Sequence, residues 1–98
     1  MTSLNLVIGN IYRQQATRET DTAVRQDLLS HARVAYGEVL KSDGDHDRAR
    51  IELGLTEGAA GNPAAAVRAF QAVIDASPGT AIAAEAASHL QQLNALPR

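Results

Sequence analysis

The apolar residues of this chain recur with a period close to that of an α-helix. Between residues 23 and 41 they form a stripe with spacings of three and four, which is typical of a helix with one buried face. Its members are Val24, Leu28, Ala32, Ala35, Tyr36, Val39 and Leu40. Similar spacing predicts further helices over residues 3–16, 46–60, 63–76 and 81–93. No segment alternates between apolar and polar residues over a useful length, so the sequence predicts an all-α protein.

Short polar segments separate the predicted helices. The segment 17–22 is rich in helix-capping residues and predicts a turn or a helix start, with one continuous helix as the alternative. Gly44 can take the left-handed conformation that ends a helix, and Asp45 can cap the next one. Glycine, asparagine and proline at 61–63 stand in the order expected for a helix end followed by a helix start. Connections of two to four residues make the five helices antiparallel neighbours.

Part of the sequence occurs twice, thirty-four residues apart. The first set is Ala32, Ala35, Tyr36, Val39 and Leu40, and the second is Ala66, Ala69, Phe70, Val73 and Ile74. A fixed period of this size is the signature of repeats that stack into an array. Such arrays usually present surfaces to partners and seldom carry chemistry.

The pattern resembles the tetratricopeptide repeat, a helix-turn-helix unit of thirty-four residues. The clearest copy is 47–80, where Leu53-Gly54, Gly61-Asn62, Ala66, Phe70 and Pro78 match the family's positions. An irregular copy spans about 2–46, with Ile8-Gly9-Asn10-Ile11-Tyr12, Ala32 and Tyr36 as its matches and about eleven extra residues between them. The helix 81–96 resembles the family's capping helix. The resemblance implies one domain over 1–98, folded as a superhelix of stacked hairpins.

Small residues stand where the resemblance brings helices close together. Gly9, Gly54 and Ser88 occupy the position at which the first helix of each unit passes closest to its partner, and only a small residue permits that approach. Tyr36 and Phe70 are then expected to fill the gap between successive units.

Composition and charge exclude several classes of function. The net charge is −2 and no basic stripe is present, so we expect no nucleic-acid partner. The chain has no cysteine, which excludes disulfides and sulfur ligands for zinc. No secretory signal and no apolar stretch of membrane-spanning length is visible, so the sequence favours a cytoplasmic protein without a membrane partner. A piece of a longer chain would look the same.

No motif indicates catalysis. The histidines His31, His46 and His89 share no metal-ligand spacing. No serine lies in a recognisable motif with a histidine and an acid, and no glycine-rich phosphate loop is present. We therefore expect a protein that is not an enzyme and that uses neither a metal nor a cofactor.

The resemblance also implies a binding groove, because the first helix of each unit lines a concave surface in that family. The corresponding residues here are Leu6, Asn10, Arg13, Gln14, Arg48, Ile51, Leu55, Ile82, Glu85, His89 and Gln92. Aliphatic residues flanked by Arg13 and Arg48 suit a partner that is acidic or exposes backbone carbonyl groups near apolar side chains. The alternative is that these residues pack against the chain's own second helix.

The predicted function is a non-catalytic interaction or scaffold module that binds a peptide or helical segment of another protein. Two alternatives stay open: a module for homo-oligomerisation, or a fragment of a longer repeat array. The helix 81–93 favours a homodimer, because apolar residues wrap much of its circumference and its only charge is Glu85. Two such ends stacked about a two-fold axis would bury that surface.

Overall fold

A computed structural model describes residues 2–95 of the chain and the side chains of residues 3–94. Five helices follow one another: α1 (Thr2–Arg18), α2 (Thr22–Ser42), α3 (Asp47–Ala59), α4 (Pro63–Ala76) and α5 (Ala81–Ala95). The described residues contain no strand, which confirms the predicted all-α class. The predicted end of the last helix, residue 96, lies outside the described residues.

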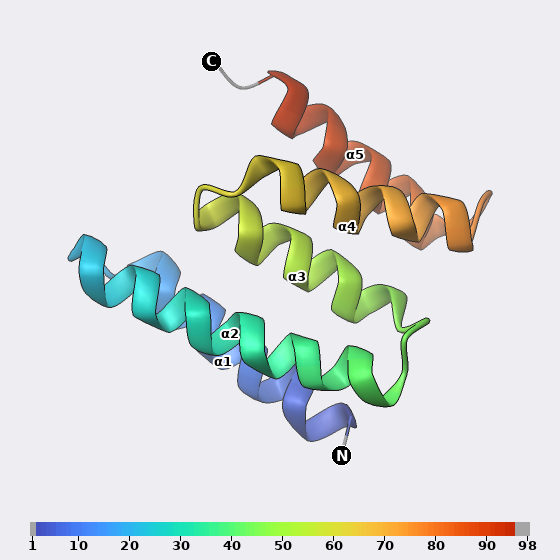
Figure 1. Cartoon of the computed structure of the whole chain (residues 1–98). Helices are drawn as coiled ribbons and strands as arrows, with labels where there is room; N and C mark the ends of the chain where they lie inside the picture. The colour runs from blue at the N-terminus through green and yellow to red at the C-terminus, as the bar shows by residue number, and fades with distance from the viewer. Residues whose placement is uncertain (1, 96–98) are drawn as a thin grey trace.

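Each helix packs mainly against its neighbours in the chain, so that the molecule is a flat slab of 39 × 38 × 18 Å. α1 and α5 lie behind α2 and α4, with α3 between the two pairs (Figure 1). Smaller contacts join α1 to α3 and α3 to α5. These three helices therefore share one surface, which we call the odd-helix face.

The turns differ in part from the sequence prediction. Asp21 caps α2 through its side chain, which accepts a hydrogen bond from the amide of Val24, so α1 and α2 are separate helices. Asp45 does not cap α3. His46 does, because its Nδ1 accepts a hydrogen bond from the amide of Ala49. Gly44 is not left-handed either, since α2 ends on extended backbone at Asp43.

The turn between α3 and α4 agrees with its sequence signature. Gly61 has a φ of 87°, a conformation that side chains other than hydrogen disfavour. The amide of Gly61 donates to the carbonyl of Gly58, and the amide of Asn62 donates to the carbonyl of Glu57. This pair of bonds satisfies the last carbonyls of α3. Pro63 then opens α4, where its missing amide proton costs nothing.

The same contact between a glycine and an aromatic ring holds both hairpins together. A Cβ atom added at Gly9 would lie 2.6 Å from the ring of Tyr36, and one added at Gly54 would lie 2.7 Å from the ring of Phe70. Both rings are almost fully buried. Each ring thus packs inside its own hairpin, whereas the sequence predicted that it would lie between successive units. Phe70 also meets the next helix, because it stacks on His89 of α5.

The eleven extra residues of the first hairpin lengthen its helices. α1 and α2 have 17 and 21 residues, whereas α3 and α4 have 13 and 14. Gly9 and Gly54 are each the eighth residue of their helix, so the four additional residues of α1 follow its glycine. The seven additional residues of α2 precede Tyr36. The first hairpin therefore extends beyond the second at its turn (Figure 1). At the rise of an α-helix, the extra residues correspond to about 6 Å along α1 and about 10 Å along α2.

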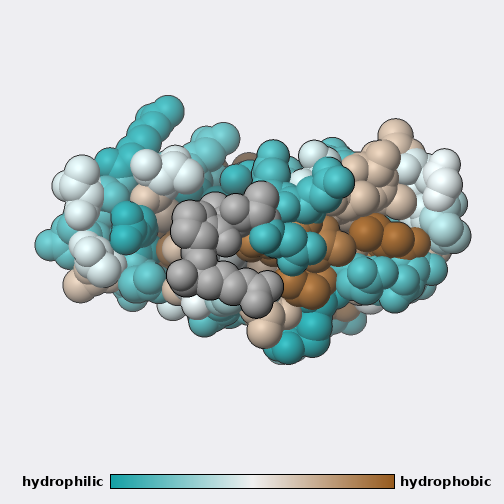
Figure 2. Space-filling model, turned by 90° about the horizontal axis from the view of Figure 1, so that it is seen from above, coloured by the Kyte–Doolittle hydropathy of each residue, from teal (hydrophilic) through white to brown (hydrophobic). Residues whose placement is uncertain are grey.

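The two ends of the stack expose different surfaces. Ala83 and Ala86 of α5 are buried, and the outer residues Ala81, Ala84, Ala87 and Ser88 are exposed. Viewed from this end, strongly apolar atoms gather in a patch that polar side chains border (Figure 2). Larger apolar side chains are exposed on α1, where Leu4, Val7 and Ile11 are 50, 52 and 48% exposed. No described helix combines the length and apolar character needed to cross a membrane.

Candidate partner-binding face

The predicted groove residues do not all reach the surface. Gln14 is exposed, and Leu6, Asn10, Arg13, Arg48, Leu55, Ile82, Glu85 and His89 are partly exposed. Ile51 is fully buried in the core cluster with Ala66, Phe70, Val73 and Ala86, so it cannot belong to a binding surface. Gln92 is exposed on α5. Apart from Ile51, the residues predicted for the groove are therefore at least partly exposed on α1, α3 and α5.

A chain of charged side chains crosses the odd-helix face from α1 to α5. Arg13 of α1 pairs with Glu52 of α3, which also lies 3.6 Å from Arg48. Arg48 donates two hydrogen bonds to Glu85 of α5, at 2.7 and 3.1 Å. Glu85 in turn lies 3.7 Å from Nε2 of His89. The two arginines proposed as donors to a partner therefore already have carboxylate partners within the chain.

Burial and pairing change the acid–base properties of these groups. Burial acts to lower the pKa of Arg13, but its hydrogen bond with the Tyr36 hydroxyl and the charge of Glu52 raise that pKa above its ordinary value. The hydrogen bond from Arg48 lowers the pKa of Glu85. The same bond raises the pKa of Arg48. Arg13, Arg48 and Glu85 are accordingly charged near neutral pH.

The Tyr36 hydroxyl anchors the α1 end of this network. It donates a hydrogen bond of 2.5 Å to Oδ1 of Asn10 and lies 3.4 Å from Nε of Arg13. Burial raises the pKa of Tyr36, so the phenol stays protonated and available as a donor. Asn10 and Arg13 are thereby held in place by the ring that fills the first hairpin.

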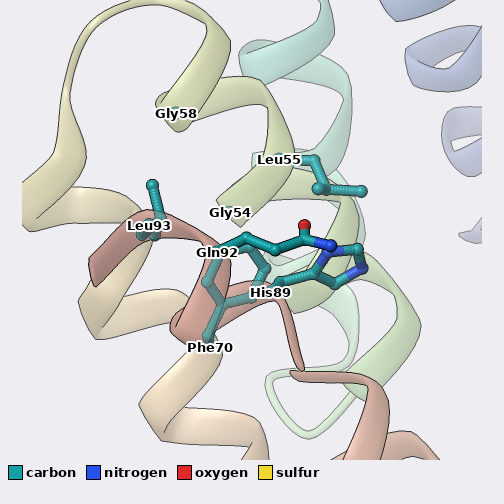
Figure 3. Close-up of a pocket in the computed structure, with 7 residues that line it drawn as sticks. All are labelled: Gly54, Leu55, Gly58, Phe70, His89, Gln92 and Leu93. Atoms are coloured by element: carbon teal, nitrogen blue, oxygen red, sulfur yellow. The ribbon is translucent and has the colours of Figure 1, made fainter. Parts of the chain in front are cut away.

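A cavity of about 260 Å³ opens between α3 and α5 (Figure 3). Its lining residues are Gly54, Leu55, Gly58, Phe70, His89, Gln92 and Leu93. The glycines leave the backbone of α3 uncovered, while Leu55 and Leu93 stand on opposite sides of the Phe70 ring (Figure 3). His89 and Gln92 supply the polar side chains. We call this space the Phe70 cavity.

A second cavity, of about 380 Å³, lies where the extended first hairpin meets α3. It is lined by Arg13, Ala16 and Thr17 of α1, Arg25 and Leu29 of α2, and Leu55 and Ala59 of α3. We call it the Arg25 cavity. Leu55 lines both cavities, so the two spaces are adjacent on the odd-helix face.

The described residues contain no group of three or more metal-ligating side chains. Each histidine has a structural contact: His46 caps α3, His31 stacks on Tyr12 with ring centroids 4.9 Å apart, and His89 stacks on Phe70 at 5.3 Å. Each of these histidine contacts is one that helix capping or packing explains.

Sequence reasoning missed two charged residues of this face. Glu52 is only 8% exposed, although a lone glutamate on a helix usually faces water. Its spacing of four residues from Arg48 was the available signal. Arg25 lies in the extra residues of the first hairpin, where the repeat pattern gives no position to compare.

No protein-family model, curated protein or solved structure matches this chain, so the function of this face has to be argued from its geometry.

Proposed function

We propose that this chain is a non-catalytic interaction module built as a tetratricopeptide-like stack. Its odd-helix face binds a peptide or helical segment of a partner protein. The observation that carries the proposal is the Phe70 cavity, which offers apolar walls and two polar side chains on an otherwise charged and self-paired surface. Apolar pockets with a few placed polar groups are the usual form of a binding site.

The size of the cavity suits one side chain. Pockets that hold drug-sized molecules have volumes of about 300–1,000 Å³, and the Phe70 cavity is slightly smaller at about 260 Å³. A leucine, methionine or phenylalanine side chain fits this space better than a whole small molecule. Gln92 and His89 stand at its polar side and can bond the backbone of the bound segment.

Binding is expected to depend on the apolar anchor more than on Arg13 and Arg48. Glu52 and Glu85 neutralise these two guanidinium groups, so a partner gains little charge attraction from them. Burial of an apolar side chain contributes about 1.5–3 kcal/mol. The partner chemistry that fits best is therefore a segment with one exposed, large apolar residue.

A variant whose own side chain fills the Phe70 cavity tests this proposal. A Cβ atom at Gly58 would make only ordinary contacts, 3.8 Å from Leu93 and 3.9 Å from Ala66. Gly58→Leu therefore places a side chain in the cavity without a clash at its first atom. The matched control is Gly37→Leu, because Gly37 lies in α2 with open space around it. Peptides selected from a random display library should bind the control and fail to bind Gly58→Leu.

Two outcomes contradict the proposal. One is a library from which no peptide is enriched on the wild-type chain. The other is a set of enriched peptides whose affinity, measured by fluorescence anisotropy, is the same for Gly58→Leu as for Gly37→Leu. Circular dichroism of both variants shows that they remain helical before binding is compared.

A second candidate function, homo-oligomerisation, is favoured by the exposed stripe Leu4, Val7 and Ile11 on α1. Residues three and four apart on a helix share one face, so these side chains form a continuous apolar strip. The sequence favoured α5 as the dimer surface, but its fully exposed apolar residues are alanines, and its larger apolar residues Ile82, Leu90 and Leu93 are only partly exposed. Light scattering at rising protein concentration tests this function: Val7→Glu should prevent association, and Val34→Glu, at an exposed site on α2, should not.

A further inference from the structure

Arg25 is a cation without a partner in the part of the chain that the structure describes. Its Nε atom is shielded from solvent and makes no hydrogen bond there. None of the ion pairs between described residues includes it. A buried donor without a partner lowers the stability of a protein, so such a group calls for a specific explanation.

The residues that line the Arg25 cavity carry positive charge and no negative charge. The Arg25 cavity is lined by two arginines, one threonine and four apolar residues, and by no carboxylate. Arg13 is paired with Glu52 across the α1–α3 contact, whereas no described carboxylate forms an ion pair with Arg25. Leu29, Leu55, Ala16 and Ala59 make the walls apolar, which strengthens the attraction of the remaining charge for an anion.

The cavity exists because the first hairpin is longer than the second. Arg25 belongs to the seven residues by which α2 exceeds α4, and Thr17 belongs to the four by which α1 exceeds α3. A repeat of ordinary length would end before either residue. The extension therefore adds a cationic wall beside the odd-helix face, next to the Phe70 cavity.

We propose that the Arg25 cavity binds a carboxylate of the same partner segment whose apolar side chain enters the Phe70 cavity. The guanidinium group of Arg25 donates hydrogen bonds to the carboxylate, and Leu55, which lines both cavities, separates the two subsites. The inference rests on the proposed function. It narrows the partner to a segment with a large apolar residue and a nearby acidic group.

The experiment uses peptides enriched on the wild-type chain from a random library, synthesised with free and with amidated C-termini. Their affinities are measured by fluorescence anisotropy for the wild type, Arg25→Gln and the control Arg18→Gln, which removes an equal charge from an exposed site in the last turn of α1. We expect an acidic residue or a free C-terminus to be required. Arg25→Gln should lower the affinity about tenfold or more, and Arg18→Gln should leave it nearly unchanged.

Replacing the acidic residue of the peptide by its amide should remove the difference between the wild type and Arg25→Gln. Loss of binding on amidation alone would identify the C-terminal carboxylate as the bound group. Arg25→Met, which keeps the aliphatic stem, should fold at least as stably as the wild type and show the same loss of affinity.

The inference is overturned if enriched peptides lack a carboxylate, or if Arg25→Gln and Arg18→Gln weaken binding equally. Peptides that respond to Gly58→Leu and ignore Arg25→Gln would leave the proposed function in place and remove this inference alone. A library without any enriched peptide would contradict both.

Discussion

Gly54→Ala isolates the close approach of α3 to the Phe70 ring. The added methyl group would lie 2.7 Å from a carbon of the buried Phe70 ring, which also stacks on His89 of α5. Inserting one carbon into a packed core costs about 1–3 kcal/mol. Alanine gains about 0.5–1 kcal/mol over glycine in a helix interior. The net expectation is a destabilisation of about 0–2.5 kcal/mol.

Gly37→Ala supplies the comparison that removes the helix-propensity term. Gly37 lies inside α2 and an added Cβ would meet nothing within 4 Å, so this variant should be stabilised by about 0.5–1 kcal/mol. The two variants should therefore differ by about 1–3 kcal/mol, which is the steric cost alone. Urea unfolding followed by circular dichroism measures both free energies.

The reasoning fails if Gly54→Ala is as stable as Gly37→Ala, because the ring would then have room to move. Adding Phe70→Leu to Gly54→Ala supplies an internal check. The smaller side chain relieves the clash, so the double variant should lose less free energy of unfolding than the two single variants together. Strict additivity would show that the glycine and the ring act independently.

Three further predictions concern the core and the charged network. Phe70→Ala should lower the free energy of unfolding by about 3–5 kcal/mol, measured by urea unfolding, and a nearly unchanged midpoint would contradict its central position. Glu52→Gln should lower the free energy of unfolding by about 2 kcal/mol, less than the loss of a fully buried pair, because Arg48 is partly exposed. Added salt should reduce the difference in unfolding free energy between the wild type and this variant. Equal stability of the two proteins would show that the carboxylate is not needed between Arg13 and Arg48. The folded state lowers the pKa of Glu85, so its contribution should be present above the ordinary glutamate value of 4.5 and disappear as the pH falls below it. The stability difference between the wild type and Glu85→Gln, followed by thermal unfolding over that range, should shrink in acid, and a difference that grows would reverse the sign of this argument.

The fold could be predicted to a large extent because local rules and the repeat agree. The helical stripe of α2 and the Gly-Asn-Pro turn at 61–63 reflect local constraints, and the small residues at Gly9 and Gly54 reflect a close contact between the two helices of one hairpin. The cap of α3 was predicted at the wrong residue because Asp45 and His46 both offer an acceptor. Histidine is the rarer choice, and only the backbone angles decide between them.

The binding face was harder to predict because it depends on distances between helices. The repeat frame placed Ile51 at a groove position, but the close packing of α3, α4 and α5 covers it. It gave Arg13 and Arg48 as free donors, since the four-residue spacing of Glu52 from Arg48 was the only signal of a pair, and the sequence does not show that Glu52 also reaches Arg13. Arg25 lies outside the repeat frame, and its cavity depends on how the longer first hairpin packs against α3, which the sequence pattern does not show.

The charged network also bears on how the molecule bends. α1, α3 and α5 touch one another at few points, and most of their packing passes through α2 and α4. The pairs Arg13–Glu52 and Arg48–Glu85 are thus direct links between helices that otherwise make few contacts. Dissolved ions weaken such links because they screen the charges. Higher ionic strength should accordingly let α1, α3 and α5 move more freely relative to one another, and the half-exposed Arg48–Glu85 pair should weaken before the more buried Arg13–Glu52 pair.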